Sequence, residues 1–314
     1  MEMPVSIRDA AHLEELLSEP SDAAIDAMRR ANGDVIVLGV AGKMGPTLAR
    51  MARRAMDAAG LMHRVIGVSR FSTPEQQRTL EACGVETIRC DLLDESAVAR
   101  LPEAPHVIFM AGRKFGSAGN EPLTWAMNAH LPAVVCARYR GSRIVAFSTG
   151  NVYGLTAHGR GGSREGDPPA PVGEYAMSCL ARERMFEYFS RKLSQPQVLL
   201  RLNYACDLRY GVLVDLAQRV WNNQSVDLAM GYFNTIWQGD ANAMALAALR
   251  RVIGTSDFTR VLRTWVADHR HGNATTDDFT ALAEEVSGEQ LDAFFEAWLR
   301  ADEPPERTAA NGLD

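Results

Sequence analysis

A glycine-rich turn between an apolar run and a helical stretch constrains the fold of this chain more than any other feature. The run VIVLGV leads into Gly39, Gly42 and Gly45, which have the spacing G-x-x-G-x-x-G. Glycines at such a turn let the backbone approach a pyrophosphate, whose charge the N–H groups and dipole of the following helix hold. The sequence therefore predicts a dinucleotide-binding turn, to which Lys43 and Met44 also belong.

Short apolar runs alternate with helical stretches over most of the chain. The runs are VIVLGV, RVIGVS, VETIRC, HVIFMAG, RIVAFST and QVLLRLN, and long helical patterns cover residues 121–139 and 173–192. Alternation at this spacing is typical of right-handed βαβ units. We therefore expect an α/β protein with a doubly wound parallel sheet, the Rossmann fold.

The pattern changes near both ends of the chain. Residues 1–33 predict an N-terminal extension of two polar helices broken at Pro20, and residues 34–254 predict the Rossmann domain with a small, incomplete substrate lobe. Residues 255–304 predict an all-helical segment, because apolar residues recur there at i, i+3 and i+4. Residues 305–314 contain few apolar side chains and predict a disordered tail.

Composition argues against several kinds of partner. The formal net charge is −6, with 33 basic and 39 acidic residues mixed along the chain, so no basic patch predicts binding to nucleic acid or a membrane. No apolar stretch approaches the roughly 18 to 20 residues of a membrane span. The five cysteines lack a C-x-x-C pair, and the seven histidines lack a ligand pattern beyond His269 and His271. We expect a cytoplasmic protein without a metal site.

The end of the second apolar run bears on the choice between NAD and NADP. An acidic residue there would accept hydrogen bonds from the ribose of NAD, but this chain has Ser69 and Arg70. Arg70, together with Lys43, could pair with the 2′-phosphate of NADP. The sequence thus favours NADP over NAD as the cofactor, and a solvated surface role for Arg70 is the alternative.

Further motifs follow the later strands. They are Asp91-Leu92 after the third run, Met110-Ala111-Gly112 after the fourth, Asn128 in the next helix, IVAFSTGNVYG at residues 144–154, and Tyr175. Together they resemble the extended short-chain dehydrogenase/reductase family, the NAD-dependent epimerase/dehydratases that often act on nucleotide sugars. The resemblance covers about residues 34–250. It implies an oxidoreductase or epimerase/dehydratase that acts on a hydroxylated small molecule, such as a nucleotide sugar, and a homodimer formed through the two long helices.

The resemblance also implies roles for individual residues. Tyr175 would exchange a proton with the substrate hydroxyl, and Thr149 would hold the same oxygen. Beside the glycine turn, the implied cofactor contacts are Ser69, Arg70, Asp91, Leu92, Met110, Ala111, Gly112, Asn128, Ser148, Tyr175 and Cys179. The loop RLNYACDLRYG replaces the family's usual Asn-Val-Tyr-Gly-Pro, so the resemblance implies no substrate contacts there.

One position departs from the family's pattern in a way that matters for catalysis. The family places a lysine four residues after the tyrosine, where it stabilises the phenolate of a group whose free pKa is about 10. This chain has Cys179 at that position. Another cation could serve instead, and Lys114 is the candidate that we favour for a catalytic role, with Arg182 one further turn along the helix. Otherwise the enzyme would be slower by about 10² to 10⁴, or the protein would bind cofactor without turnover, as a sensor or scaffold.

The C-terminal segment has a resemblance of its own. GNATTDDF and SGEQLDAFFEAWL, within residues 256–304, resemble the C-terminal helical region of zinc aminopeptidases of the aminopeptidase N type. The His-Glu-x-x-His motif that peptidase chemistry requires does not occur in the chain, so we expect no peptidase activity. We interpret the segment as a fusion, and a chance likeness in a helical cap or an interaction module as alternatives.

Overall fold

The structure is a computed structural model that describes residues 6–31, 33–114, 119–157, 159, 161–227, 234–248, 281–282 and 284–285. The chain divides into two compact units, Met1–Leu246 and Ala247–Asp314. The first unit holds the elements below, apart from the final residue of α10. Apart from the four residues given above, the predicted helical segment 255–304 and the tail 305–314 lie outside the described residues.

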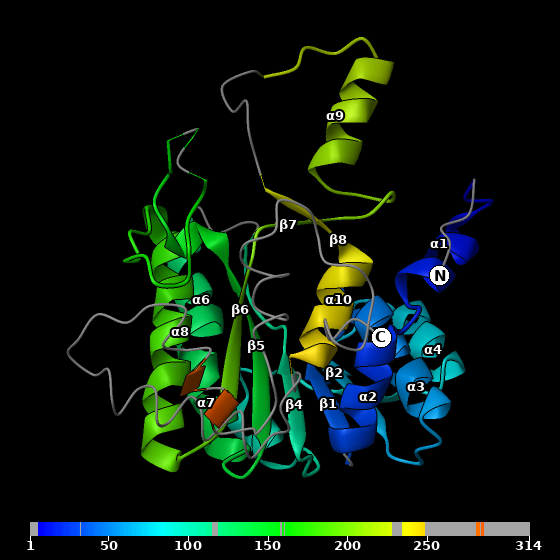
Figure 1. Cartoon of the computed structure of the whole chain (residues 1–314), viewed down its shortest axis with the longest axis vertical. Helices are drawn as coiled ribbons and strands as arrows, with labels where there is room; N and C mark the ends of the chain where they lie inside the picture. The colour runs from blue at the N-terminus through cyan, green and yellow to red at the C-terminus, as the bar shows by residue number, and fades with distance from the viewer. Residues whose placement is uncertain are drawn as a thin grey trace. The chain divides into compact units, whose positions relative to one another are not determined.

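The first unit is built on a parallel sheet of six strands in the order β3-β2-β1-β4-β5-β6 (Figure 1). The strands are β1 (Val35–Leu38), β2 (Val65–Ser69), β3 (Glu86–Arg89), β4 (His106–Phe109), β5 (Arg143–Thr149) and β6 (Gln197–Leu202). Val35 pairs with Val65 on one side and with His106 on the other. The strand order thus reverses between β1 and β4, and the predicted doubly wound parallel sheet is confirmed.

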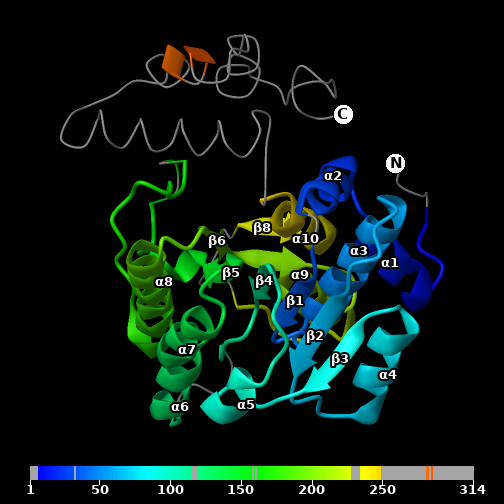
Figure 2. The same cartoon turned by 90° about the horizontal axis from the view of Figure 1, so that it is seen from below.

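Helices cover both faces of this sheet (Figure 2). They are α1 (Ala10–Leu17), α2 (Asp22–Ala31), α3 (Gly45–Ala58) and α4 (Pro74–Ala82) around one face, and α5 (Glu95–Ala99), α6 (Glu121–Trp125), α7 (Leu131–Arg138) and α8 (Gly173–Leu193) around the other. The predicted break at Pro20 separates α1 from α2, and both pack on α3. Asp9 caps α1 by accepting a hydrogen bond from the His12 amide at 2.8 Å.

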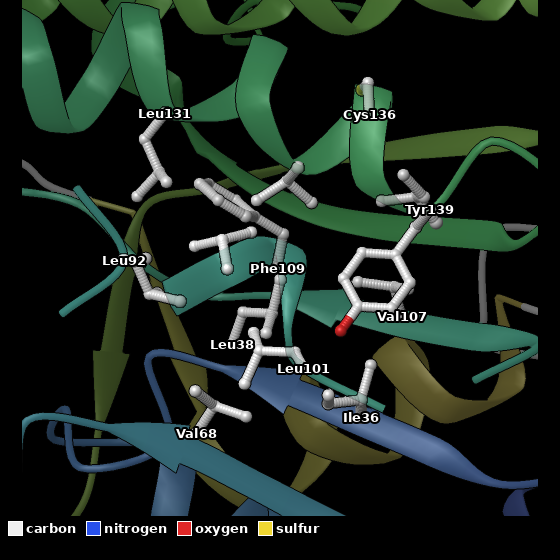
Figure 3. Packing of buried hydrophobic residues seen from close by; sticks show 14 of the residues in the cluster. Ile36, Leu38, Val68, Leu92, Leu101, Val107, Phe109, Leu131, Cys136 and Tyr139 are labelled. Carbon is white, nitrogen blue, oxygen red and sulfur yellow. The ribbon is translucent and has the colours of Figure 1, made fainter. Parts of the chain in front are cut away.

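A core of apolar side chains fills the space between the sheet and α5, α7 and α8. Phe109 of β4 lies among the labelled residues of this core (Figure 3) and meets the Phe186 ring edge-on, with the centroids 5.2 Å apart. Strands β1 and β4 are buried along their whole length. Because both faces of a parallel sheet are covered, such strands read as continuous apolar runs rather than as alternating ones.

A second, two-stranded parallel sheet continues the first unit beyond β6. It consists of β7 (Tyr204–Cys206) and β8 (Thr235–Trp237), and the helices α9 (Val212–Trp221) and α10 (Gln238–Ala247) follow them. α9 buries none of its residues, and Trp221 at its end is 87% exposed. Within the described part of the chain, no helix combines the length and the apolar character that crossing a membrane requires.

Candidate functional site

The glycine turn links the end of β1 to the first residue of α3. The amide of Gly39 donates to the Val68 carbonyl at 2.9 Å, the amide of Gly42 to the Gly39 carbonyl at 3.1 Å, and that of Gly45 to the Gly42 carbonyl at 3.3 Å. Met44 precedes α3 without a side-chain cap. The first amides of a helix have no intrahelical acceptors, so the start of α3 can donate to an anion.

Close packing explains why glycine occupies two of these positions. A Cβ at Gly45 would lie 2.2 Å from the Val40 carbonyl oxygen, and one at Gly39 would lie 2.7 Å from the Ala111 amide nitrogen. Gly39 also has a φ of 91°, in the region that favours glycine. The turn therefore lies directly against the end of β4, next to the reversal of strand order where α/β sheets bind nucleotides. A bare backbone cradle at a helix start fits a pyrophosphate.

Tyr210, from the loop before α9, contacts the glycine turn. Its hydroxyl lies 3.0 Å from the Lys43 carbonyl oxygen and also contacts the Gln238 side chain. The Lys43 ammonium lies 4.7 Å from the centroid of the Tyr210 ring. Sequence reasoning missed this residue, which gives Lys43 an aromatic partner within its own chain.

The residues predicted at the adenine end come together at the ends of β2 and β3. Cys90 donates its amide to the Ser69 carbonyl at 2.9 Å, and the Arg70 guanidinium lies 4.0 Å from the Asp91 carboxylate. Both charged side chains are well exposed, at 72% and 51%. Leu92 instead packs its side chain into the core.

Thr149 and Tyr175 meet beside the end of β5. Thr149 is the last residue of β5, and Tyr175 lies in the first turn of α8. Burial raises the pKa of Tyr175 to about 12, and Cys179, one turn further along α8, raises it too, whereas Arg182 and a hydrogen bond with Thr149 lower it. The structure thus brings the predicted tyrosine and threonine together, in surroundings that favour the neutral phenol.

Lys114 approaches the same tyrosine from the loop after β4. Its ammonium lies 6.0 Å from the centroid of the Tyr175 ring and 5.2 Å from that of Tyr204. Cation–π attraction acts within about 6 Å. Lys114, which the sequence suggested as a substitute for the missing lysine, therefore lies near the Tyr175 ring; its catalytic role stays a prediction.

Asn128 ties this loop to α8. Its side-chain oxygen accepts from the Arg113 amide at 2.9 Å and from Arg182 at 2.6 Å, and its side-chain nitrogen donates to the Arg113 carbonyl and to Ser178, both at 3.0 Å. Asn128 lies in a π-helical turn, η1 (Ala126–His130). Pro132 follows four residues later, and its ring would clash with the Asn128 carbonyl of a regular α-helix, which accounts for the wider turn.

A buried charged cluster lies behind Thr149. Glu183 of α8 is fully buried and accepts hydrogen bonds from Ser148 and from Arg201 of β6, the latter at 2.8 Å. Arg201 also donates to the Tyr153 hydroxyl. The Ser148 hydroxyl, predicted at the cofactor site, is therefore engaged with Glu183. Sequence reasoning missed both members of the pair, although an arginine inside the apolar run QVLLRLN was a signal.

The remaining predicted cofactor residues line the end of β4. Met110 donates its amide to the Leu38 carbonyl at 2.9 Å, and Ala111 lies against Gly39. A Cβ at Gly112 would lie 2.3 Å from a guanidinium nitrogen of Arg182. Among the residues that the structure describes, no three His, Cys, Asp or Glu side chains gather in a way that could hold a metal ion.

Comparisons with known proteins agree with the Rossmann fold of the chain. The family model described as "NAD dependent epimerase/dehydratase family" matches residues 35–205. A search of curated proteins finds no match.

Three similar solved structures illustrate the likeness. The Thermus thermophilus UDP-glucose 4-epimerase complex with NAD has 24% identity and a TM-score of 0.57, over 70% of this chain and 75% of that chain. The Helicobacter pylori ADP-L-glycero-D-manno-heptose-6-epimerase has 17% identity and a TM-score of 0.60, over 71% and 75%. The Bordetella bronchiseptica enzyme WbmG, in complex with NAD and UDP, has 19% identity and a TM-score of 0.57, over 82% and 89%. At these identities the likeness shows the fold.

Proposed function

Because this chain belongs to the NAD-dependent epimerase/dehydratase family, we propose that it binds NAD(P) at the glycine turn and uses Tyr175 to exchange a proton with a substrate hydroxyl. The observation that carries the proposal is the meeting of Tyr175 with Thr149 at the end of β5. Thr149 ends β5, which pairs with β4, and the segment after β4 lies against Gly39 of the backbone cradle that fits a pyrophosphate.

In this reaction the bound nicotinamide would accept or supply a hydride. Thr149 would hold the oxygen of the substrate hydroxyl by a hydrogen bond, and Tyr175 would take or return its proton. A phenol with a pKa of about 12 ionises poorly near neutral pH. The Lys114 ammonium lies 6.0 Å from the centroid of the Tyr175 ring. Its positive charge would favour the phenolate and so fill the catalytic role of the missing lysine.

The proposed substrate is a small hydroxylated molecule of the nucleotide-sugar class. Support comes from the similar structures, whose descriptions name UDP-glucose and ADP-heptose epimerases and bound UDP. Tyr210, in the loop between β7 and α9, contacts Lys43 and so brings the segment after β7 next to the glycine turn.

The proposed cofactor preference is for NADP over NAD. Arg70 is 72% exposed, and at 4.0 Å its pairing with Asp91 is loose enough for it to turn toward a 2′-phosphate. Titrating the protein with NADP⁺ and NAD⁺ beside an Arg70→Ala variant tests this preference. We expect the variant to bind NADP⁺ about tenfold more weakly than the parent does and to bind NAD⁺ equally well. An unchanged affinity for NADP⁺ would refute the proposal.

The proposed assembly is a homodimer in the cytoplasm, formed through the helical run 121–138 and α8. In support, α8 exposes Met177, and all five cysteines are unpaired, as in reducing compartments. Light scattering should give twice the chain mass at micromolar concentration, and a monomer there would contradict the dimer. Fractionation of cells that express the protein tests its location.

A second candidate is a cofactor-binding protein without turnover, a sensor or scaffold. Cys179 favours it, because burial raises the pKa of this thiol and leaves it uncharged beside Tyr175.

One experiment separates the two candidates. Purified protein is screened for bound nicotinamide and for hydride transfer across nucleotide sugars, beside Tyr175→Phe and the matched control Tyr188→Phe on the exposed side of the same helix. The enzyme hypothesis predicts activity that Tyr175→Phe lowers by about 10² to 10⁴ and Tyr188→Phe leaves intact. Cofactor binding without activity, or equal activity in all three proteins, would refute it.

A further inference from the structure

Arg182 is a buried cation on the same face of α8 as Tyr175 and Cys179. The three positions are related as i, i+4 and i+7, which places them one above another along the helix. Arg182 is only 7% exposed. Its guanidinium donates to the Phe147 carbonyl at 2.8 Å and to the Asn128 side-chain oxygen at 2.6 Å. Both acceptors are neutral, and the Nε atom has no hydrogen-bond partner.

The surroundings are built around this guanidinium. It lies 5.7 Å from the centroid of the Phe109 ring, and the missing side chain of Gly112 leaves the space that its terminal nitrogen fills. Its sequence neighbour Glu183 is already engaged with Arg201 and Ser148. No carboxylate within the described residues bonds to Arg182. Burying an arginine without an anionic partner is costly, and burial lowers the pKa of this group.

We propose that Arg182 supplies the positive charge that Cys179 lacks. Its role is to favour ionisation of Tyr175 from a position within α8, whereas Lys114 acts from the loop after β4. The inference rests on the proposed acid/base role of Tyr175. The Arg182 guanidinium donates to the Phe147 carbonyl and to Asn128, and we assign it as a positioning residue that acts through its charge. Its attraction lowers the pKa of both Tyr175 and Cys179, in the direction that this role requires.

A site-specific probe tests the charge without relying on catalysis. A fluorinated tyrosine, which is more acidic than tyrosine, is incorporated at position 175, and the 19F shift of the cofactor-loaded protein is followed against pH. We expect Arg182→Gln, which keeps donor groups but removes the charge, to raise the midpoint by about one pH unit or more. Arg182→Lys should leave it near the parent's value. Arg184→Gln, at an exposed position of the same helix, is the matched control and should not shift it.

Equal midpoints in the parent and Arg182→Gln proteins would overturn the inference. If that variant does not fold, as judged by its thermal unfolding, the comparison is made in a Cys179→Lys background, where a lysine keeps a cation on this face. Arg182→Gln should again raise the midpoint there, and no shift would overturn the inference. The Cys179→Lys change should also lower the midpoint of the Arg182→Gln protein.

The pH dependence of catalysis gives a second readout. If Tyr175 acts as the base, kcat/KM rises with pH as Tyr175 ionises. In Arg182→Gln this rise should shift to higher pH, as the 19F midpoint does. If Arg182→Gln raises the 19F midpoint but the parent protein shows no hydride transfer, the proposed function is refuted and this inference stands. Hydride transfer that requires Tyr175, with no 19F shift, would refute this inference alone.

Discussion

Replacing Glu183 with glutamine removes a carboxylate from the interior of the first unit. Glu183 is fully buried on α8. Its two carboxylate oxygens share a bifurcated hydrogen bond from the Arg201 Nε–H, at 3.0 and 3.2 Å, and one of them accepts another from a terminal guanidinium nitrogen at 2.8 Å. It also accepts the Ser148 hydroxyl. Glutamine has nearly the same volume, so the substitution removes the charge without opening a cavity.

The expected cost follows from the exposure of the two partners. Removing one member of a buried ion pair costs about 3 to 5 kcal/mol, because the other charge is left unpaired. Arg201 retains 20% exposure and its bond to Tyr153, so water can solvate part of its charge. We therefore expect a loss near the lower limit, about 3 kcal/mol, in the free energy of unfolding.

Urea denaturation followed by circular dichroism measures this loss, with the slope of the transition checked for constancy. Glu187→Gln is the matched control: it breaks the Arg184–Glu187 pair on the same helix, whose side chains are 52% and 31% exposed. A pair so exposed contributes at most about 1 kcal/mol. If the two substitutions cost the same, the cluster behind Thr149 does not stabilise the protein in the way argued above.

Two further predictions concern other parts of the first unit. Gly45→Ala places a Cβ 2.2 Å from the Val40 carbonyl oxygen and must open the turn, so we expect NAD(P) affinity to fall by about 5- to 150-fold, the equivalent of a 1 to 3 kcal/mol overpacking cost. Titration beside Gly141→Ala, where a Cβ meets nothing within 4 Å, checks this, and equal affinities would contradict it. Burial lowers the pKa of His106 below 6.5 despite its hydrogen bond to the Ala31 carbonyl, so the unfolded chain takes up the proton first and stability should decline as pH falls through about 6.5 toward the lower folded value. His106→Gln should flatten that decline in urea unfolding between pH 7.5 and 5.5, and an unchanged slope would rule out His106 as its source.

The fold was largely predictable because its signals are local. The run VIVL is apolar throughout, and HVIF is apolar after His106, because a parallel sheet buries both faces of its strands; the glycine turn marks the first strand-to-helix transition. Periodicity cannot show the order in which strands lie side by side, which depends on the crossover connections. It also missed the π turn at Asn128, which interrupts the continuous helix predicted for residues 121–139.

The positions of candidate site residues were predictable where they lie at the carboxyl ends of strands, as Thr149 and Arg70 do. The contacts that sequence reasoning missed join distant segments. Tyr210 contacts Lys43 of the glycine turn, 167 residues away in the sequence. Arg201 of β6 contacts Glu183 of α8. Such pairs depend on how the second sheet and α8 pack, which no local pattern encodes. The roles of Thr149, Tyr175 and Lys114, and the nature of residues 255–304, stay predictions.

The close approach of Arg182 to Gly112 has a consequence for the divergence of this family. The guanidinium and any side chain at position 112 would need the same volume, because an added Cβ would lie 2.3 Å from it. The two positions should therefore change together: a relative with a lysine at the place of Cys179 can dispense with the arginine and accept a larger residue at 112. For protein design, a side chain larger than glycine at position 112 calls for a matching change at position 182, rather than a single substitution.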